Sequence, residues 1–254
     1  MTNRVNVLGV GISVLNLKTA LDEIAAAVRE RRKGYICVRD AHGVMLAQKD
    51  AAFRRILNEA FLCTPDGMPM VWIGRLHGHR EMSRVYGPDL MLEVCAWSET
   101  NSCRHFFYGG TPGVAEELRG KLTARFPKLQ TVGCYTPPFR PLNTEEEKEL
   151  RVMIHVAKPD IMWVGLSTPK QEKFMAEFLP KLDVTLMIGV GAAFDFHAGR
   201  VRQAPRWMQR SGLEWLFRVA CEPRRLGKRY LKNNPLFAWK IAGQLSGLKK
   251  YSLE

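Results

Sequence analysis

The sequence predicts an α/β fold: a Rossmann-like, mostly parallel sheet with helices on both faces, followed by a basic helical appendage at the C-terminus. Up to Gly199, short apolar runs typical of buried strands alternate with amphipathic helical segments. This alternation is the pattern of parallel strands joined by crossover helices. After Gly199 the strand-like runs stop and only helical segments follow. We therefore expect an α/β body over residues 1–199 and a basic amphipathic appendage over residues 200–254.

The expected elements follow one another in regular order. Apolar runs bounded by turn residues predict strands at 5–10, 35–38, 61–63, 104–108, 131–135, 161–165 and 186–190. Segments with a helical period predict helices at 17–31, 51–58, 88–99, 112–125, 144–157 and 169–179. The appendage is expected to contain consecutive helices at 203–211, 213–221, 223–232 and 235–245. A hydrophobic content of 46% supports a sizeable core.

Positive charge is concentrated in the C-terminal fifth of the chain. The formal net charge is +13, and residues 200–254 contain thirteen Lys or Arg against three acidic residues. Trp207, Trp215 and Phe217 are interleaved with these cations. Basic helices that carry large aromatic residues are typical of binding at an anionic membrane surface. A solvated basic face, or a surface that binds nucleic acid, are the alternatives.

The cysteine pattern and the lengths of the apolar segments indicate the cellular compartment of the protein. The six cysteines form no CxxC pair and no zinc-ligand spacing, which favours buried free thiols in a reducing environment. No stretch reaches the roughly 20 apolar residues that a membrane-spanning helix needs, and no signal peptide is evident. We expect a cytoplasmic protein, with any membrane contact peripheral and on the inner face of the plasma membrane.

Polar side chains follow several of the expected strands. Gln171 and Glu172 follow the strand at 161–165, and Asp195 follows the strand at 186–190. Open α/β sheets bind ligands at the carboxyl ends of their strands, so these residues are candidates for a binding site. Helix capping and dipole compensation are the structural alternative for Gln171 and Glu172. Tyr135, after another strand, could line the same site or pack in the core.

A glycine-rich turn joins the expected strand at 104–108 to the next helix. It contains Gly109, Gly110 and Thr111, and Pro112 suits the first position of a helix. Backbone amides at such a helix start can bind a diphosphate. The run is not GxGxxG, and no acidic residue follows about 20 positions later, which argues against a dehydrogenase. A sugar nucleotide fits this turn better.

Five blocks of the chain resemble the WecG/TagA/CpsF glycosyltransferases, glycosyltransferase family 26, and occur in the family's order. They read TPDGMPMVW, RVYGPDLM, PKQE, GVGAAFDFHAGRVRQAPRWMQ and GLEWLFR-x3-EPRRL. The resemblance covers roughly residues 5–230. It implies an inverting transferase that moves a sugar from a UDP-sugar to a polyprenyl-diphosphate-linked saccharide in bacterial cell-surface or exopolysaccharide synthesis. It makes a homo-oligomer plausible, which nothing in the composition requires.

The resemblance also suggests a catalytic base. Forming a glycosidic bond by inverting transfer needs a carboxylate that removes the proton of the acceptor hydroxyl. Asp66, in the TPDG block, matches the family's proposed base; an ordinary turn aspartate is the alternative. Arg84, in the RVYGPD block, would contact the donor phosphate or the developing charge; a salt bridge or a surface position is the alternative.

Further residues are assigned to substrate by the same resemblance. Gln171 would contact the sugar nucleotide, and the Asp195 carboxylate could accept hydrogen bonds from ribose or base. Arg218 and Arg225 match tail arginines proposed to contact phosphates. A lipid-diphosphate acceptor would explain why the same segment carries both aromatic residues and cations.

One position departs from the family pattern. Many members carry Thr-x-Asn after the second strand, where this chain has Val38 and Asp40. Val38 cannot donate a hydrogen bond, and an ionised Asp40 can only accept. The N-acetylmannosamine-type donor of the better-known members therefore cannot be carried over. His42 lies nearby in sequence and could orient a carboxylate or contact the sugar, although a lone histidine is usually structural.

No cofactor or metal is expected. The chain has no DxD and no His/Cys cluster, so we expect arginines and backbone amides to stabilise the leaving diphosphate. Two other classes remain open. One is a different sugar-nucleotide enzyme, such as an epimerase or dehydrogenase, which would hold NAD. The other is a non-catalytic basic protein that binds nucleic acid or membranes.

Overall fold

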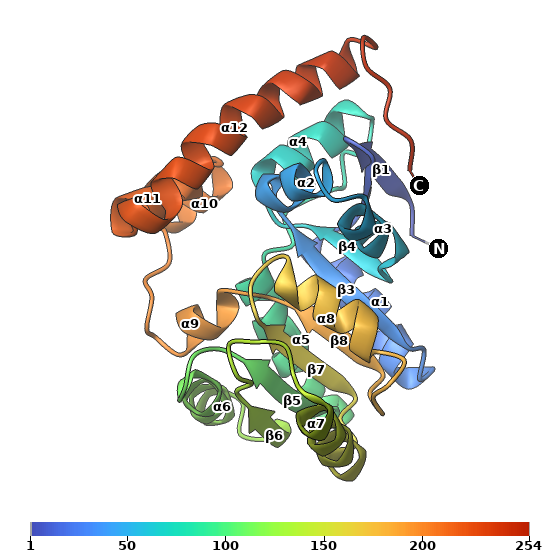
Figure 1. The fold of residues 1–254 in the computed structure, drawn as a ribbon, viewed down its shortest axis with the longest axis vertical. Coiled ribbons are helices and arrows are strands. Elements are labelled where there is room, and N and C mark those ends of the chain that lie inside the picture. Colours follow the sequence, from blue (N-terminus) through green and yellow to red (C-terminus); the bar gives the residue numbers. More distant parts are fainter. Residues whose placement is uncertain (1, 254) are drawn as a thin grey trace. The chain divides into compact units, whose positions relative to one another are not determined.

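The computed structural model describes residues 2–253 and divides into two compact units (Figure 1). The first unit combines Met1–Leu17, Val38–Tyr86 and Gln203–Glu254, and the second combines Lys18–Cys37 and Gly87–Arg202. The helices after Gln203 are thus grouped with the N-terminal strands and not set apart from everything before them. The body and appendage expected on either side of residue 199 follow chain order, and that division stays a prediction.

The second unit is built on a parallel sheet, as the sequence predicts. The strand order is β3-β8-β7-β5-β6 and each neighbouring pair is parallel. The strands are β3 (Gly34–Arg39), β5 (Arg104–Gly109), β6 (Gln130–Tyr135), β7 (Ile161–Gly165) and β8 (Leu186–Gly189). The helices are α1 (Leu17–Arg29), α5 (Gly87–Asn101), α6 (Val114–Arg125), α7 (Thr144–Ala157), α8 (Lys170–Phe178) and α9 (Ala193–His197). β3 and α1 each cross the boundary between the units by one or two residues.

The direction in which successive strands are added to the sheet reverses between β5 and β7. From β5 the chain passes through α6 to β6, on one side, and from β7 it passes through α8 to β8, on the other. Right-handed crossovers place helices on opposite faces when the direction reverses. α7 and α8 accordingly lie in front of the sheet in Figure 1. The expected α/β fold with helices on both faces is confirmed.

The first unit contains a hairpin where the sequence predicts one strand at 5–10. β1 (Arg4–Val7) and β2 (Val10–Ser13) are antiparallel, with Val7 opposite Val10. Leu8 and Gly9 form the two-residue turn and both have positive φ, 53° and 82°. Such turns usually carry Asn-Gly or Gly-Gly. Because Leu8 is apolar and buried, the sequence shows one continuous apolar run and gives no sign of the turn.

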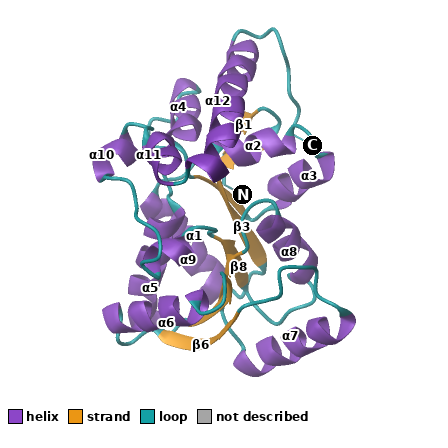
Figure 2. Cartoon of the chain, turned by 60° about the vertical axis from the view of Figure 1, so that its left-hand side comes forward, coloured by secondary structure: helices purple, strands orange, loops and turns teal. Residues whose placement is uncertain are grey.

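The rest of the first unit is mainly helical. This unit also contains the strand β4 (Leu62–Pro65). The helices are α2 (Ala41–Ala47), α3 (Ala51–Glu59), α4 (Met68–Leu76), α10 (Arg206–Arg210), α11 (Glu214–Cys221) and α12 (Pro223–Leu245). Figures 1 and 2 both show α12 running alongside α2 and α4. The sequence analysis does not predict α2 or α4, which are seven and nine residues long.

α12 is one helix, where the sequence predicts a break between residues 232 and 235. Pro235 lies inside it. A proline in a helix interior costs about 3 kcal/mol. The buried Leu226, Tyr230, Phe237 and Ile241 recur on one face of α12. Burying such side chains contributes about 1.5–3 kcal/mol each, so the packing of this face outweighs the cost of the proline.

Four of the six cysteines are buried, as the sequence predicts for free thiols. Cys37, Cys63, Cys95 and Cys103 are buried, whereas Cys134 is half-buried and Cys221 is exposed. The two exceptions lie at the end of β6 and the end of α11.

No helix within residues 2–253 is long and apolar enough to cross a membrane.

Candidate active site

In the first unit, Asp66 and Arg84 are held where adjacent strands end. β3 ends at Arg39 and β4 ends at Pro65, and the Asp66 amide donates to the Arg39 carbonyl over 2.9 Å. The Val85 amide donates to the Pro65 carbonyl over 2.8 Å. These backbone bonds place Asp66 and the segment around Arg84 side by side, although 18 residues separate them.

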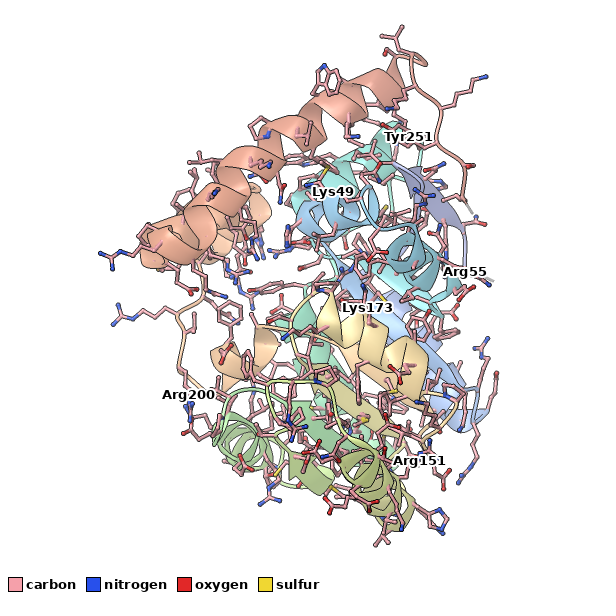
Figure 3. All side chains as sticks on the ribbon, in the orientation of Figure 1. Lys49, Arg55, Arg151, Lys173, Arg200 and Tyr251 are labelled. Carbon is pink, nitrogen blue, oxygen red and sulfur yellow. The ribbon has the colours of Figure 1, made fainter. Side chains whose placement is uncertain are left out.

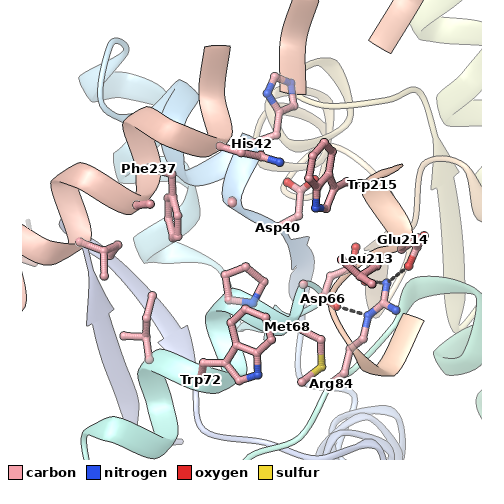
Figure 4. A pocket seen from close by; sticks show the side chains of 18 of the residues that line it. Asp40, His42, Asp66, Met68, Trp72, Arg84, Leu213, Glu214, Trp215 and Phe237 are labelled. Carbon is pink, nitrogen blue, oxygen red and sulfur yellow. Dashed lines mark hydrogen bonds and ion pairs between the residues drawn. The ribbon is translucent and has the colours of Figure 1, made fainter. Parts of the chain in front are cut away.

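The Arg84 guanidinium joins two carboxylates (Figure 4). Its Nη2 lies 3.2 Å from Asp66 Oδ1 and 2.6 Å from Glu214 Oε2. Its Nε donates to the Asp66 backbone carbonyl. Tyr86 completes the cluster, because its hydroxyl donates to Glu214 Oε1 over 3.2 Å and its ring lies 4.0 Å from the guanidinium carbon. Arg84 therefore lies in a salt bridge, which is the structural alternative that the sequence analysis gives for it.

The pKa of the Asp66 carboxyl is higher than that of an ordinary aspartate. Its side chain retains only 23% of its exposed surface, at the wall of a cavity. Burial raises the Asp66 pKa to about 6; Arg84 opposes this rise, and Glu214 and Asp40 add to it. A carboxylate with a pKa about one unit below neutrality is mostly ionised at pH 7 and is more basic than an ordinary aspartate. Both properties suit a general base.

Asp40 and His42 lie beside the cluster but have other partners. Asp40 caps α2 and accepts from the Gly43 amide over 2.9 Å. Burial acts to raise the Asp40 pKa, but Arg39, His42 and the Gly43 amide outweigh it and hold the pKa below its ordinary value. Asp40 is therefore the weaker base of the two. Asn233 of α12 lies 3.0 Å from His42 Nδ1, which fixes the imidazole against that helix.

Asp40, His42, Asp66, Arg84 and Glu214 line a cavity of about 540 Å³ within the first unit. Its charged part contains Asp40, Asp66, Arg84, Glu214 and Arg218. The remaining wall is mostly apolar and comes largely from α4, α11 and α12; it includes Met68, Trp72, Ile73, Leu76, Trp215, Phe237 and Ile241. Arg225 is not among the lining residues. It is exposed on α12 and its Nη2 pairs with Glu222 over 2.7 Å.

The second unit has its own cavity, of about 430 Å³, at the reversal point between β5 and β7. In open α/β sheets, ligands bind outside the carboxyl ends of the strands at such a point. Gly110 and Gly165 line it, and the Gly110 amide donates to the Gly165 carbonyl over 3.0 Å. At Gly109, where φ is +122°, a Cβ atom would lie 2.7 Å from the Gly165 carbonyl. Only glycine allows these two strand ends to approach so closely.

Polar and aromatic side chains complete this second cavity. Thr111, Lys170, Lys173 and Asp195 line it, and Lys173 projects from α8 (Figure 3). The rings of Tyr108 and Phe174 are stacked with centroids 4.4 Å apart. α6 starts at Val114, after Gly113 with φ +84°, so Pro112 lies in the turn and not at the first helical position as predicted. The positive φ values of Gly109, Gly110 and Gly113 are not helical, so the helix starts two residues later than predicted.

Tyr135, Gln171 and Glu172 lie close to this cavity without lining it. Tyr135 stacks on Tyr108 with centroids 5.9 Å apart. Gln171 and Glu172 are buried, and Gln171 Nε2 donates to Glu172 Oε1 over 2.8 Å. Neither side chain caps α8, but Glu172 lies in the first turn of this helix, where a carboxylate can compensate the helix dipole. Their roles toward substrate stay predictions.

The sequence reading missed Glu214, Tyr86 and the apolar wall. Glu214, in the GLEWLFR block, is one of only three acidic residues in the basic segment 200–254, and that contrast could have singled it out. Trp72 and Phe237 gave no comparable signal, because apolar residues at helical spacing usually belong to a core. Within residues 2–253, no group of three or more His, Cys, Asp or Glu side chains is arranged to hold a metal ion.

Comparison with known proteins places this geometry in a family. Residues 5–251 match the family described as "Glycosyl transferase WecG/TagA/CpsF family". The chain is 31% identical over 177 residues to a Bacillus subtilis (strain 168) protein named N-acetylglucosaminyldiphosphoundecaprenol N-acetyl-beta-D-mannosaminyltransferase. That match covers 70% of this chain and 67% of the relative. The chain therefore belongs to the WecG/TagA/CpsF family of glycosyltransferases.

Proposed function

We propose that this glycosyltransferase moves a sugar from a UDP-sugar to a saccharide linked through diphosphate to a polyprenyl lipid, with inversion at the anomeric carbon, in cell-surface or exopolysaccharide synthesis. The observation that carries the proposal is the cavity of the first unit. It combines a basic carboxylate, Asp66, with a mostly apolar wall from α4 and α12. A lipid-linked sugar acceptor needs both. The B. subtilis relative is named for a diphosphoundecaprenol-linked acceptor, which agrees with this choice.

Asp66 is the proposed general base. Its carboxylate takes the proton of the acceptor hydroxyl as the hydroxyl oxygen attacks the anomeric carbon. The bond from that carbon to the diphosphate oxygen breaks, and UDP leaves with the electron pair. A single displacement of this kind inverts the configuration at the carbon. Asp40 is less suited because its pKa is held low and its carboxylate caps α2.

The charged end of the same cavity suits the acceptor's diphosphate. Arg218 lines the cavity from α11. A guanidinium binds phosphate oxygens through paired hydrogen bonds in a fixed fork. The lipid chain would then run along the apolar residues Trp72, Phe237 and Ile241. Arg225 is exposed and engaged by Glu222, so we give it the smaller share in phosphate binding.

The donor nucleotide is assigned to the cavity of the second unit. The glycine turn at the end of β5 offers backbone amides, and Lys170 and Lys173 offer positive charge for a diphosphate. Asp195 can accept hydrogen bonds from ribose or base, and the stacked Tyr108 and Phe174 offer an aromatic wall. Because cations and amides suffice to hold the leaving group, we propose that no metal ion is needed.

The basic, partly apolar surface of the C-terminal helices is the proposed membrane contact. Trp207, Leu231, Trp239 and Leu248 are exposed there among lysines and arginines. Replacing Leu231 and Trp239 by alanine should reduce co-sedimentation with anionic vesicles. Replacing the equally exposed Val152 and Val156 of α7 should leave it unchanged. Equal sedimentation of both double variants would remove this surface from the proposal.

The decisive experiment is a transfer assay. Purified protein is incubated with radiolabelled UDP-sugars, including UDP-N-acetylmannosamine, and a short polyprenyl-diphosphate-linked N-acetylglucosamine. We expect transfer from at least one donor, with inverted configuration in the product, and no loss of rate in EDTA. Absence of transfer from every common UDP-sugar by folded protein would contradict the proposed activity. Loss of rate in EDTA, with recovery on adding Mg²⁺ or Mn²⁺, would contradict metal independence.

A further inference from the structure

Glu214 is a buried acid that contacts the proposed base only through another residue. It is the first residue of α11, and only 14% of its side chain is exposed. One carboxylate oxygen accepts from Arg84 Nη2 over 2.6 Å, and the other accepts from the Tyr86 hydroxyl over 3.2 Å. Glu214 lies 130 residues along the chain from Arg84, so the C-terminal segment must be folded in place to make this pair.

The distances show how the Arg84 charge is shared. The same Nη2 atom is 2.6 Å from Glu214 and 3.2 Å from Asp66, so the guanidinium binds Glu214 more closely. Glu214 thereby limits how strongly Arg84 stabilises the negative charge on Asp66. One cation between two carboxylates also leaves an excess negative charge beside Asp66. Both effects favour binding of a proton by the Asp66 carboxylate.

We infer that Glu214 is a positioning residue: it draws Arg84 away from Asp66 and keeps the Asp66 carboxylate basic enough to remove a proton from the acceptor. This inference rests on the proposed function for the role of Asp66 as base. It means that α11 contributes to the chemistry as well as to the cavity wall. Without Glu214, Arg84 would pair with Asp66 alone and would make it a weaker base.

The other charged groups around Asp66 act together with Glu214. Asp40, before α2, adds negative charge, and His42 lies on α2 itself. Arg84 and Tyr86 face Asp66 and Glu214 from the segment before α5, and Arg218 lies on α11 with Glu214. Burial, Glu214 and Asp40 raise the pKa of Asp66, and Arg84 lowers it. Removing the Glu214 charge should therefore lower the Asp66 pKa.

The test compares Glu214→Gln with Glu59→Gln in the full-length protein. Glu59 lies on α3 in the same unit, is exposed and pairs with Arg55, so it matches the charge change away from the cavity. The Asp66 carboxyl is followed by ¹³C NMR during a pH titration, with Asp66→Asn used to assign its signal. In Glu214→Gln we expect the Asp66 titration to move down by about half a unit or more. In Glu59→Gln we expect no movement.

Kinetics give an independent readout. The acidic limb of the pH profile of kcat/KM should move to lower pH in Glu214→Gln, and the plateau rate should fall by up to about threefold for a shift of half a unit, because the base is weaker. Glu214→Asp keeps the charge and should lie between wild type and Glu214→Gln. It also serves as the test variant if Glu214→Gln does not fold.

The outcomes separate the inference from the proposed function. An unchanged Asp66 titration in folded Glu214→Gln, or in Glu214→Asp when only that variant folds, overturns the inference. A loss of rate with no movement of the acidic limb would indicate a purely structural role and also overturns it. If wild-type protein transfers no sugar but the NMR titration moves as expected, the proposed function fails while the electrostatic effect of Glu214 stands.

Discussion

The cavities of the two units are built from different kinds of contact. In the second unit the backbone defines the site: strand ends meet at glycines, and the Gly110 amide binds the Gly165 carbonyl. In the first unit side chains define it, because Asp66, Arg84 and Glu214 come from three distant segments and share one charge network. The comparison indicates that the second cavity depends on backbone conformation, whereas the first depends on charge balance.

Removing the proposed base should have the largest effect. Asp66→Asn keeps the size of the side chain but cannot accept a proton at neutral pH. We expect kcat to fall at least about 100-fold, within the usual range for a lost general base. The affinity for UDP, measured by calorimetry, should stay within about twofold because the nucleotide is assigned to the second unit. Near-normal turnover would exclude Asp66 as the base and direct attention to Asp40.

A glycine substitution tests the second cavity in the same way. Gly109→Ala would force a Cβ to within 2.7 Å of the Gly165 carbonyl at φ +122°. Strain of this kind costs of order 1–3 kcal/mol and is relieved by moving the turn. We expect UDP affinity to fall by roughly 30-fold and the melting temperature to drop.

Gly120→Ala is the matched control for that change. Gly120 lies in α6, and an added Cβ would have no heavy atom within 4 Å. Alanine in a helix interior is favoured over glycine by roughly 0.5–1 kcal/mol, so this variant should bind UDP normally and melt slightly higher. If Gly109→Ala binds UDP as well as Gly120→Ala does, the turn does not form the nucleotide site.

The second unit could largely be predicted from sequence because its elements follow local rules. The capping box of Asn143 and Glu146 fixes the start of α7 where the sequence places it. The strands at 161–165 and 186–190 are short apolar runs bounded by glycines, and they end within one residue of the predicted positions. Their loops carry polar residues to one edge of the sheet. A parallel sheet turns such local patterns into a site without further information.

The first unit could not be predicted as fully, because its site depends on long-range contacts. The sequence pointed to Asp66 and Arg84 separately, but nothing in it paired Arg84 with Glu214. Leu8 in a left-handed turn and Pro235 inside α12 also contradict local preferences. In both places the buried packing around the residue outweighs its conformational cost. Contacts of this kind are decided by the whole fold rather than by the neighbouring residues.

We expect the two tail arginines to contribute unequally to the use of the lipid acceptor. Arg218 lines the first cavity, whereas Arg225 is exposed and paired with Glu222. A hydrogen bond to a charged group contributes about 1.5–3 kcal/mol. Arg218→Ala should therefore lower kcat/KM for the lipid acceptor about tenfold, and Arg225→Ala by about twofold or less. Vesicle binding should change little in either variant, since most of the tail cations remain. Equal loss in both would mean that Arg225 leaves Glu222 to bind substrate.

The smallest effect concerns stability, and it follows from the charge network alone. The pKa of Asp66 is about 6 in the folded protein and near 3.8 in an unfolded chain. A carboxyl with a raised folded pKa disfavours folding once it is ionised, and this cost develops between about pH 4 and pH 6. Asparagine imitates the neutral form at every pH. Asp66→Asn should thus melt close to wild type at pH 3.5 but about 2–6 °C higher at pH 7.5, for a gain of roughly 1–2 kcal/mol. Asp22→Asn, at an exposed position on α1, should show no such pH dependence. The same difference between Asp66→Asn and wild type at both pH values would mean that the first cavity does not raise the pKa of Asp66. The two cavities would then differ in the residues that line them but not in the role of charge.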